Sequence, residues 1–337
     1  VDEVAWKGRI RYRYIRRMEE RSPAAHHDES RNTNQVLFRL EPTARIHAHW
    51  AGKARIDYGR PDTMHTGANV TNAKVDRLYV EGDYSSTRIT LGLFPLATKA
   101  DYGMVSDISM AGGQVVFGRE VKVAIAAGRI HDRDNRLFTA DGINPSAMRR
   151  FLDGTANYQG IEVYNDRTQT FTWGIGFQRV TQADGWDTTL LGTGHSIKNP
   201  NGPIRIWNVG LGYRFHSALS LTGAYAMATG IDPLPGNTVD GKHKHAYAFA
   251  LNYKGAKANQ RGSWGAFLAY RHLGGLSTLY STHQVFGPMQ GGEKGWEIGM
   301  SWTPLKNVVG KVQYYQGKEL ISDHSVKALW TELGFLF

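Results

Sequence analysis

Hydrophobic and polar residues alternate with a period of two along most of the chain. Between Trp6 and Tyr14 every second residue is apolar or glycine, and the residues between them are lysine or arginine. Residues 207–215 and 296–302 show the same alternation, with tryptophan at the start of each. A helix would mix the two classes around its circumference, whereas a strand separates them onto two faces. The pattern therefore predicts β-strands that each have one apolar and one polar face.

Sixteen segments with this alternation follow one another along the chain. Their expected bounds are 4–17, 34–46, 49–60, 73–83, 86–97, 111–118, 120–130, 156–165, 169–180, 204–214, 218–229, 243–254, 262–273, 292–303, 307–317 and 326–337. Short and long connectors alternate between them, and the long ones are 18–33, 61–72, 98–110, 131–155, 181–203, 230–242, 274–291 and 318–325. A tilted strand of about ten residues crosses a bilayer, and outer-membrane barrels join such strands by short turns at one rim and long loops at the other. The sequence therefore predicts an all-β fold, a single transmembrane antiparallel β-barrel domain of about 16 strands over residues 1–337.

The ends of the apolar faces distinguish a membrane barrel from a soluble sandwich or propeller, which would show the same alternation. The apolar faces begin and end with aromatic residues, as at Trp6 and Tyr14. Tryptophan and tyrosine are enriched at both interfaces of a membrane. The chain also ends on Phe337 with no polar tail. These features favour the membrane barrel, and we expect a mature chain because the first residues lack the basic and apolar regions of a secretion signal.

The last strand, 329–337, resembles the closing strand of Gram-negative outer-membrane porins, in which alternating apolar residues end on a terminal phenylalanine. The whole chain resembles the sixteen-stranded, trimeric general porins. Among them it looks most like the porins of diderm Firmicutes that form the barrel part of S-layer-homology outer-membrane anchors. Those anchors carry an N-terminal peptidoglycan-binding domain and a coiled-coil stalk, and this sequence has neither. We therefore expect either another branch or the barrel portion alone.

This resemblance implies a location, partners and a constriction. The location is the bacterial outer membrane with both termini periplasmic, and the partners are a homotrimer, outer-membrane lipid or lipopolysaccharide, and the barrel assembly machinery, which would read Phe337 as its signal. Residues 94–96 and the segment after them stand where such porins fold their third long loop into the barrel. Residues 98–110 are therefore the expected constriction loop, with the candidate residues Lys99, Asp101, Tyr102 and Asp107.

The net charge is +10, from 40 lysines and arginines against 30 acids, and many of the cations lie on one face of the predicted strands. On the parity opposite to the aromatic residues, the first five strands carry ten cations against the acids Glu41, Asp57 and Glu81. The ten are Lys7, Arg9, Arg11, Arg13, Arg39, Arg45, Lys53, Arg55, Arg77 and Arg88. Lysine and arginine along a narrow pore favour anions. We therefore predict a basic wall along the lumen and a bias toward anions.

The later strands carry mostly small or neutral residues on the lumen parity, among them Thr170, Thr172, Gly174, Ser220, Thr222, Ala224, Ala226, Ala246, Ala248 and Ala250. We expect these residues to leave room for solutes. We also expect the constriction loop, with Asp101 and Asp107, to lean toward the basic wall and set up a transverse field. The alternative is that these two are ordinary loop carboxylates.

Other chemistry has little support in the sequence. A nucleic-acid surface would need aromatic residues beside the arginines for stacking, and here they lie on the opposite parity, so we expect no nucleic acid as partner. The absence of cysteine removes thiolate zinc sites and cysteine nucleophiles. His243 and His245 would share one strand face but lack a third ligand, and His47 and His49 flank a tight turn. We expect no metal, no cofactor and no catalytic residue.

The expected function is that of an outer-membrane porin that admits small hydrophilic solutes, neutral or anionic, by passive diffusion. A barrel of about sixteen strands is wide enough to leave an aqueous channel. One alternative is a barrel that serves as an envelope tether or adhesin. A second is a barrel-type phospholipase, which would need a serine and a histidine on the apolar faces of adjacent strands, and His245 has no such serine beside it.

Overall fold

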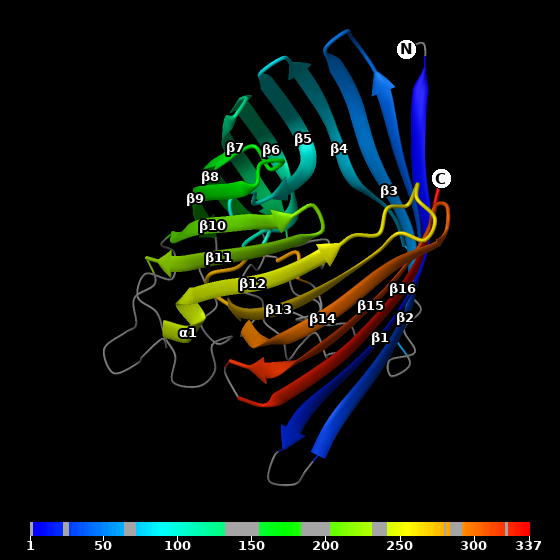
Figure 1. Cartoon of the computed structure of the whole chain (residues 1–337). Helices are drawn as coiled ribbons and strands as arrows, with labels where there is room; N and C mark the ends of the chain where they lie inside the picture. Colours follow the sequence, from blue (N-terminus) through cyan, green and yellow to red (C-terminus); the bar gives the residue numbers. More distant parts are fainter. Residues whose placement is uncertain are drawn as a thin grey trace.

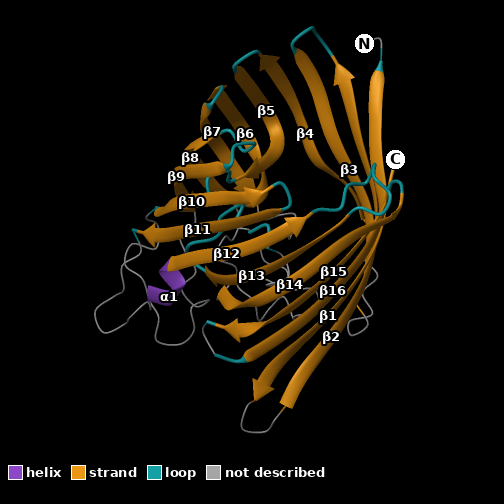
Figure 2. Cartoon of the chain, in the orientation of Figure 1, coloured by secondary structure: helices purple, strands orange, loops and turns teal. Residues whose placement is uncertain are grey.

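The computed structural model describes residues 3–22, 27–63, 72–131, 155–182, 203–230, 241–279, 281–283, 292–320 and 323–337. They form sixteen strands and one short helix, α1 (Gly241–Lys244) (Figures 1 and 2). The strands are β1 (Val4–Ser22), β2 (His27–Arg45), β3 (Trp50–Thr63), β4 (Asn72–Tyr84), β5 (Thr87–Ala97), β6 (Asp107–Gly118), β7 (Val121–His131), β8 (Thr155–Asn165), β9 (Phe171–Gln182), β10 (Ile204–His216), β11 (Leu219–Thr229), β12 (His245–Lys254), β13 (Trp264–Gly274), β14 (Gly292–Leu305), β15 (Val308–Glu319) and β16 (Ser325–Leu336).

The sheet closes on itself. Each strand pairs antiparallel with its neighbours in the chain, and β1 pairs with β16, so the strands form a closed barrel. At the seam the backbone amide of Gly8 donates to the carbonyl of Phe337 at 2.9 Å, and the amide of Phe337 donates back to Gly8 at 3.0 Å. Closure leaves no strand edge with unpaired backbone groups, which a barrel in lipid requires. The predicted all-β barrel of sixteen antiparallel strands is confirmed.

The two faces of each strand differ as the alternation predicts. Along β10, Trp207, Val209 and Leu211 are exposed, whereas Asn208 and Gly210 between them are buried. Exposed tryptophan, tyrosine, phenylalanine and aliphatic side chains recur on the same outward parity around the barrel. A continuous apolar belt of this kind is unstable in water but suits the hydrocarbon core of a membrane. Within the described residues, no helix is long and apolar enough to cross a bilayer.

A charge placed in the outward belt should be far more costly than one on the inward face. Leu268 and Ile298 are register partners on β13 and β14, 46% and 56% exposed, so replacing either with arginine should destabilise the barrel by about 2–4 kcal/mol. Ser301 of β14 lies on the opposite parity, and its replacement with arginine is the control. Urea unfolding in lipid vesicles measures all three variants, and equal losses of stability at the three sites would reverse the assignment of the faces.

The strand bounds agree with the sequence-based ones to within a few residues, except at the first hairpin. β1 and β2 are 19 residues each and continue through most of the segment 18–33, which the sequence predicted to be a long loop. Seventeen consecutive backbone pairings run from Val4 and Ala44 to Glu20 and Asp28, so the hairpin continues where the apolar alternation has ended. The expected long loops 131–155, 181–203 and 230–242 lie mostly outside the described residues. Both termini lie at the rim that carries the short turns, here called the short-turn rim (Figure 1); the opposite rim is the long-connector rim.

A hydrophobic core lies inside the barrel, mostly along β5 to β13, with further members on β15 and β16. It includes Met104 and Val105, which follow β5, and Leu276 and Leu279, which follow β13, all at most 5% exposed. These side chains pack on small inward residues of β11 and β12, among them Ala226, which is fully buried. Burying one leucine or methionine contributes about 1.5–3 kcal/mol. The expectation that the small residues leave room for solutes is therefore wrong for this part of the lumen, because inward segments of the chain fill the space above them.

Candidate functional site

The inward face of β1 to β5 carries most of the predicted basic wall. Arg9, Arg11 and Arg13 alternate with outward Ile10 and Tyr12 on β1, because a strand turns successive side chains to opposite faces. The registers of β2, β3 and β4 bring the inward cations of those strands beside them: Arg9 is opposite Arg39, and Arg55 is opposite Arg77. Cations on neighbouring strands thus form one continuous surface along the inside of the barrel.

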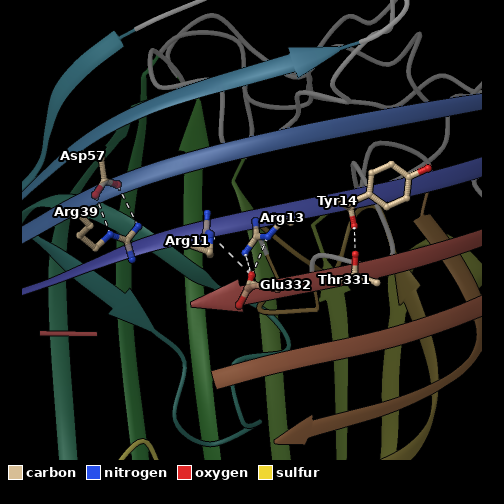
Figure 3. Close-up of polar contacts among 7 residues, drawn as sticks. All are labelled: Arg11, Arg13, Tyr14, Arg39, Asp57, Thr331 and Glu332. Atoms are coloured by element: carbon tan, nitrogen blue, oxygen red, sulfur yellow. Dashed lines mark hydrogen bonds and ion pairs between the residues drawn. The ribbon is translucent and has the colours of Figure 1, made fainter. Parts of the chain in front are cut away.

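Acidic residues neutralise part of this surface. Figure 3 shows Arg11 and Arg13 of β1 directed at one carboxylate, Glu332 of β16. Arg13 donates to Glu332 Oε1 at 2.6 and 2.8 Å, whereas the nearest nitrogen of Arg11 lies 3.8 Å away. In the same figure Arg39 donates to both oxygens of Asp57, at 2.7 and 3.0 Å. Arg39 and Asp57 are 9% and 3% exposed, so this pair is a fixed part of the wall.

Further along the wall, two looser pairs continue the pattern. Lys53 donates to Glu81 at 3.0 Å and Arg55 donates to Glu41 at 3.2 Å. Glu41 retains about a third of its side-chain exposure and Lys53 likewise (34% and 33%), so both stay in contact with the lumen. Ion pairs of this kind are worth about 0–1 kcal/mol each and are screened by salt. They position the cations, and Lys53 stays partly exposed on the inward face.

The wall retains an excess of positive charge. Lys7, Arg9 and Arg77 form no ion pair with any other residue that the structure describes. Arg39 adds electrostatic repulsion on its neighbours Arg11, Arg55 and Arg77. In addition, the Nε atoms of those same three neighbours are buried and have no hydrogen-bond acceptor within the described part of the chain. The surplus positive charge along this face favours anions such as a carboxylate, phosphate or halide.

Two of the predicted wall residues lie at the short-turn rim instead. Arg45 is exposed at the end of β2, and its Nη1 donates to the carbonyl of Ala48 at 3.1 Å in the turn that follows. Arg88, near the start of β5, is 53% exposed and pairs with Asp83 at 3.2 Å. Both side chains bind groups at the mouth of the barrel, because their strands end there. The alternation predicts the strand face of both residues but not their depth along the barrel.

Residues 98–106, between β5 and β6, lie inside the barrel against the wall opposite to the basic one. The amides of Lys99 and Ala100 donate to the two carboxylate oxygens of Glu162 on β8, at 3.0 and 2.7 Å. The Tyr102 hydroxyl lies 2.6 Å from that of Thr172 on β9. Arg167, in the turn after β8, donates to the Lys99 carbonyl at 2.6 Å. The loop therefore leans on β8 and β9, and the expectation that it leans on the basic wall is wrong.

Inward glycines of β9 and β10 form the seat of this loop. An ideal Cβ at Gly210 would lie 1.9 Å from the carbonyl oxygen of Ala100, and one at Gly174 would lie 2.6 Å from the Ala100 Cα. At Gly212 it would lie 2.5 Å from the Tyr102 hydroxyl. Any larger side chain at Gly210 would occupy the space of the loop backbone. The absence of side chains here is thus the local reason why the loop lies where it does.

The four candidate residues of the loop have different environments. Lys99 is exposed and Tyr102 is half-buried, whereas Asp101 is 1% exposed. One Asp101 oxygen accepts from the amide of Val105 at 3.1 Å, and the other has no partner within the described residues. Burial raises the pKa of the Asp101 carboxyl from 3.8 to about 6. Asp107 is half-buried at the start of β6. Asp101 therefore binds the backbone of its own loop, and its carboxyl group does not face the lumen.

The raised pKa of Asp101 predicts that the seated loop loses stability as the pH rises. Stability from this group is complete below about pH 3.8 and is lost as the pH passes through about 6, a total of roughly 3 kcal/mol. Asp101→Asn keeps an acceptor for Val105 but cannot ionise. In urea unfolding in lipid at about pH 4 and about pH 7.5, the variant should gain on the wild type at the higher pH. An equal difference at both pH values would show that folding does not raise the pKa of the Asp101 carboxyl.

Residues 275–279 and 281–283 support the loop from the other side. The amide of Leu279 donates to the carbonyl of Val105 at 2.8 Å, and the amide of Thr282 donates to that of Gly103 at 3.0 Å. The amide of Leu276 donates to the carbonyl of His243 at 3.0 Å, which connects the segment to α1. The two inward segments thus form one layer over β8 to β12. The lumen that remains is bounded by this layer on one side and by the basic wall on the other.

The histidines that the sequence singled out do not form a shared site. His243 lies in α1 and is 1% exposed, whereas His245 begins β12, and its Nδ1 lies 2.5 Å from the Tyr225 hydroxyl. The helix breaks the strand periodicity, so the two side chains do not share a face as predicted. His49 stacks on Tyr84 with ring centroids 4.5 Å apart. Among the described residues, no group of three or more histidine or acidic side chains is arranged to hold a metal ion.

Sequence reasoning missed the residues that hold the loop, namely Glu162, Arg167 and Thr172. The strands of Glu162 and Thr172 and the turn of Arg167 were predicted correctly. A lone inward glutamate on β8, however, does not indicate what it binds. The one usable signal was the row of inward glycines on adjacent strands at Gly174 and Gly210, since glycine inside a strand marks the close approach of another backbone.

Known proteins resemble this chain in structure only. No protein-family model and no curated protein matches its sequence. Among solved structures, a double mutant of the Rh. blastica porin superposes with a TM-score of 0.54 at 9% identity, covering 99% of this chain and 100% of that one. A five-site mutant and a triple mutant of the same porin, the latter named as Rhodopseudomonas blastica, each give 0.54 at 10% identity with the same coverage. The chain therefore has the sixteen-stranded barrel fold of an outer-membrane porin.

Proposed function

We propose that the protein is a passive outer-membrane channel for small hydrophilic solutes, with a preference for anions. The observation that carries the proposal is the inward face of β1 to β5, on which Lys7, Arg9 and Arg77 have no ion-pair partner among the described residues. A charged surface beside water and between low-dielectric walls concentrates counter-ions. Neutral solutes small enough for the remaining lumen would pass without this advantage.

In this proposal residues 98–110 narrow the channel from the side of β8 to β10, and the basic wall faces them across the lumen. Among residues 98–106, Lys99 and Tyr102 keep exposed surface, whereas Asp101 acts through the loop fold. The field across the narrowest part then arises from the arginines and the backbone of the loop. The candidate wall residues of the constriction are Arg9, Arg11, Arg55 and Arg77.

The proposal includes an orientation and partners. Long connectors face the exterior and both termini face the periplasm, in the bacterial outer membrane. Phe337 lies at the closing seam and stacks on Phe38, with ring centroids 6.3 Å apart. Before the barrel closes, it would be accessible there as a signal to the barrel assembly machinery. A homotrimer, outer-membrane lipid or lipopolysaccharide, and a relation to the barrels of Firmicutes envelope anchors are further parts of the proposal that follow from the sequence resemblance.

The alternatives have weaker support. A tether or adhesin needs a binding surface and has no use for unpaired arginines inside the barrel. A phospholipase needs a serine beside the histidine on the apolar face, and His245 binds the phenol of Tyr225 instead. The channel is thus the function that the inward charge favours.

Swelling of proteoliposomes tests conduction directly. Vesicles that contain the purified protein should swell in small uncharged sugars and faster in small organic anions of equal size. Vesicles without protein are the control. Swelling no faster than in the control, from protein with the far-UV spectrum of a folded barrel, would favour the tether over the channel.

A further inference from the structure

The outer surface of the barrel carries a groove near the long-connector rim that the channel function does not use. It has a volume of about 800 Å³ and crosses the outward faces of β13 to β16 and β1. Three lysines line it, Lys294, Lys318 and Lys327. Each lies within three residues of the strand end that meets a long connector. The groove is therefore positively charged at one edge of the outward apolar belt.

The placement of these lysines is unfavourable for the barrel alone. Lys294 and Lys318 are direct register partners on β14 and β15, on the same outward parity, and Lys327 is paired with Gln316 one step away. Like charges directly opposite on neighbouring strands are destabilising. A position of this kind is stable when an anion lies between the cations.

The described protein supplies too little negative charge to fill that role. Lys318 lies 3.7 Å from Asp323, with both side chains at least half exposed. Glu20, which also lines the groove, accepts a hydrogen bond from the backbone amide of Ser325 at 3.1 Å. Lys294 and Lys327 form no ion pair with another residue that the structure describes. The groove therefore retains an unmatched positive charge.

A second groove continues the first into the apolar belt. It has a volume of about 390 Å³ and is lined by apolar and aromatic residues of β11 to β14, including Leu221, Phe249 and Leu268. Tyr270 and Trp296 line both grooves, and their rings touch edge to face with centroids 5.1 Å apart. An amphipathic aromatic pair between a cationic and an apolar groove corresponds to the boundary between headgroups and acyl chains. The two grooves form one elongated site with a charged end and an apolar end.

We propose that this site binds a membrane lipid with a phosphorylated headgroup. The phosphate lies between Lys294, Lys318 and Lys327, which can each donate to it, and an acyl chain follows the apolar groove past Trp296. The lipid would belong to the leaflet at the long-connector rim. The site requires only that the barrel lies in a membrane, so its test is independent of conduction through the lumen.

Native mass spectrometry of the purified protein, titrated with dioleoyl phosphatidic acid, tests the site. We expect one phosphatidic acid to be retained more tightly than the others that bind the belt. The triple variant K294Q/K318Q/K327Q should weaken this binding roughly 10- to 100-fold, whereas K257Q/R261Q/K306Q, which removes three exposed cations at the short-turn rim, should leave it unchanged. The substituted lysines are on the surface, and the unchanged far-UV spectrum would verify folding.

Two further ligands separate the parts of the site. Dioleoyl glycerol has the same chains without a phosphate and should be retained much more weakly than phosphatidic acid. Inorganic phosphate has no chains and should compete only at far higher concentration. The proposal is overturned if diacylglycerol binds as tightly as phosphatidic acid, or if both triple variants lose the same affinity, since the lysines would then contribute no specific phosphate site.

Discussion

Neutralising Arg9, Arg11, Arg55 and Arg77 to glutamine is expected to remove the anion preference of the channel. These side chains carry the positive charge of the basic wall that acids do not fully match, and in the proposed channel they act on permeant ions through water. In a salt gradient the reversal potential should shift toward cation preference. The shift should be largest at low salt, because the Debye length falls from about 10 Å at 0.1 M to about 3 Å at 1 M.

The four arginines are chosen according to the ion pairs that the wall residues form. Arg39 is left intact because it donates to both oxygens of the buried Asp57, and removing one partner of a buried ion pair costs about 3–5 kcal/mol. Removal of Arg11 leaves Glu332 with Arg13, at 2.6 Å. The double variant K257Q/K306Q, at exposed positions of the short-turn rim, is the control for net charge. A quadruple variant with the wild-type reversal potential at low salt would place the selective part of the channel elsewhere.

Replacing Gly210 with valine is expected to displace the loop 98–106 from its seat and widen the channel. The new Cβ alone would lie 1.9 Å from the carbonyl oxygen of Ala100, and the opposing groups are backbone atoms that cannot rotate away. If the loop stayed in place, the overpacking would cost at least about 1–3 kcal/mol. Because the Ala100 carbonyl and a side chain at Gly210 cannot occupy the same space, the loop backbone around Ala100 should move away from β10. Single-channel conductance should increase, while the barrel remains closed.

Gly334→Val supplies the matched control. Gly334 also lies inward, on β16 beside the basic wall, but a Cβ there would meet nothing closer than the Val309 carbonyl at 3.8 Å. Its conductance should stay close to that of the wild type. If Gly210→Val lowers the conductance or leaves it unchanged while the protein folds, the loop does not limit the lumen on the side of β10.

The strands could be predicted from the sequence because the fold is governed by a local rule. A barrel in lipid has one face in hydrocarbon and one in the lumen, so each segment such as 204–214 carries its own alternation, and short turns mark the ends. The same rule fails at the first hairpin. Beyond Met18 both faces of β1 and β2 are polar, so the alternation vanishes while the backbone pairing continues to Glu20 and Asp28.

The sequence predicts only which face of its strand each residue of the candidate site lies on. The inward direction of Arg9 or Arg55 follows from counting residues, whereas the bond between Arg39 and Asp57 depends on the register of β2 and β3. The position of the loop depends on contacts between residues more than 60 apart in sequence, as between Ala100 and Glu162. Nothing in the local pattern encodes such pairs, so the loop was assigned to the wrong wall.

The depth of a residue along a strand is also hidden from the pattern. Arg45 and Arg88 have the parity of the wall, yet they pair with groups at the short-turn rim. Similarly, the α1 turn before β12 changes the direction of His243 relative to His245 and separates a pair that strand periodicity would align. A two-residue period reports which face a side chain is on, but the strand ends and the breaks in the period come from tertiary contacts.

In the proposed function the lumen conducts ions and its basic wall selects anions. The most direct test is the reversal potential of the purified wild-type protein in a planar bilayer of uncharged lipid that separates dilute from concentrated potassium chloride. We expect stepwise channel openings and a reversal potential at which the dilute side is negative, because chloride crosses more readily than potassium. Openings with the dilute side positive, or no openings from protein that is folded in the bilayer, would contradict it.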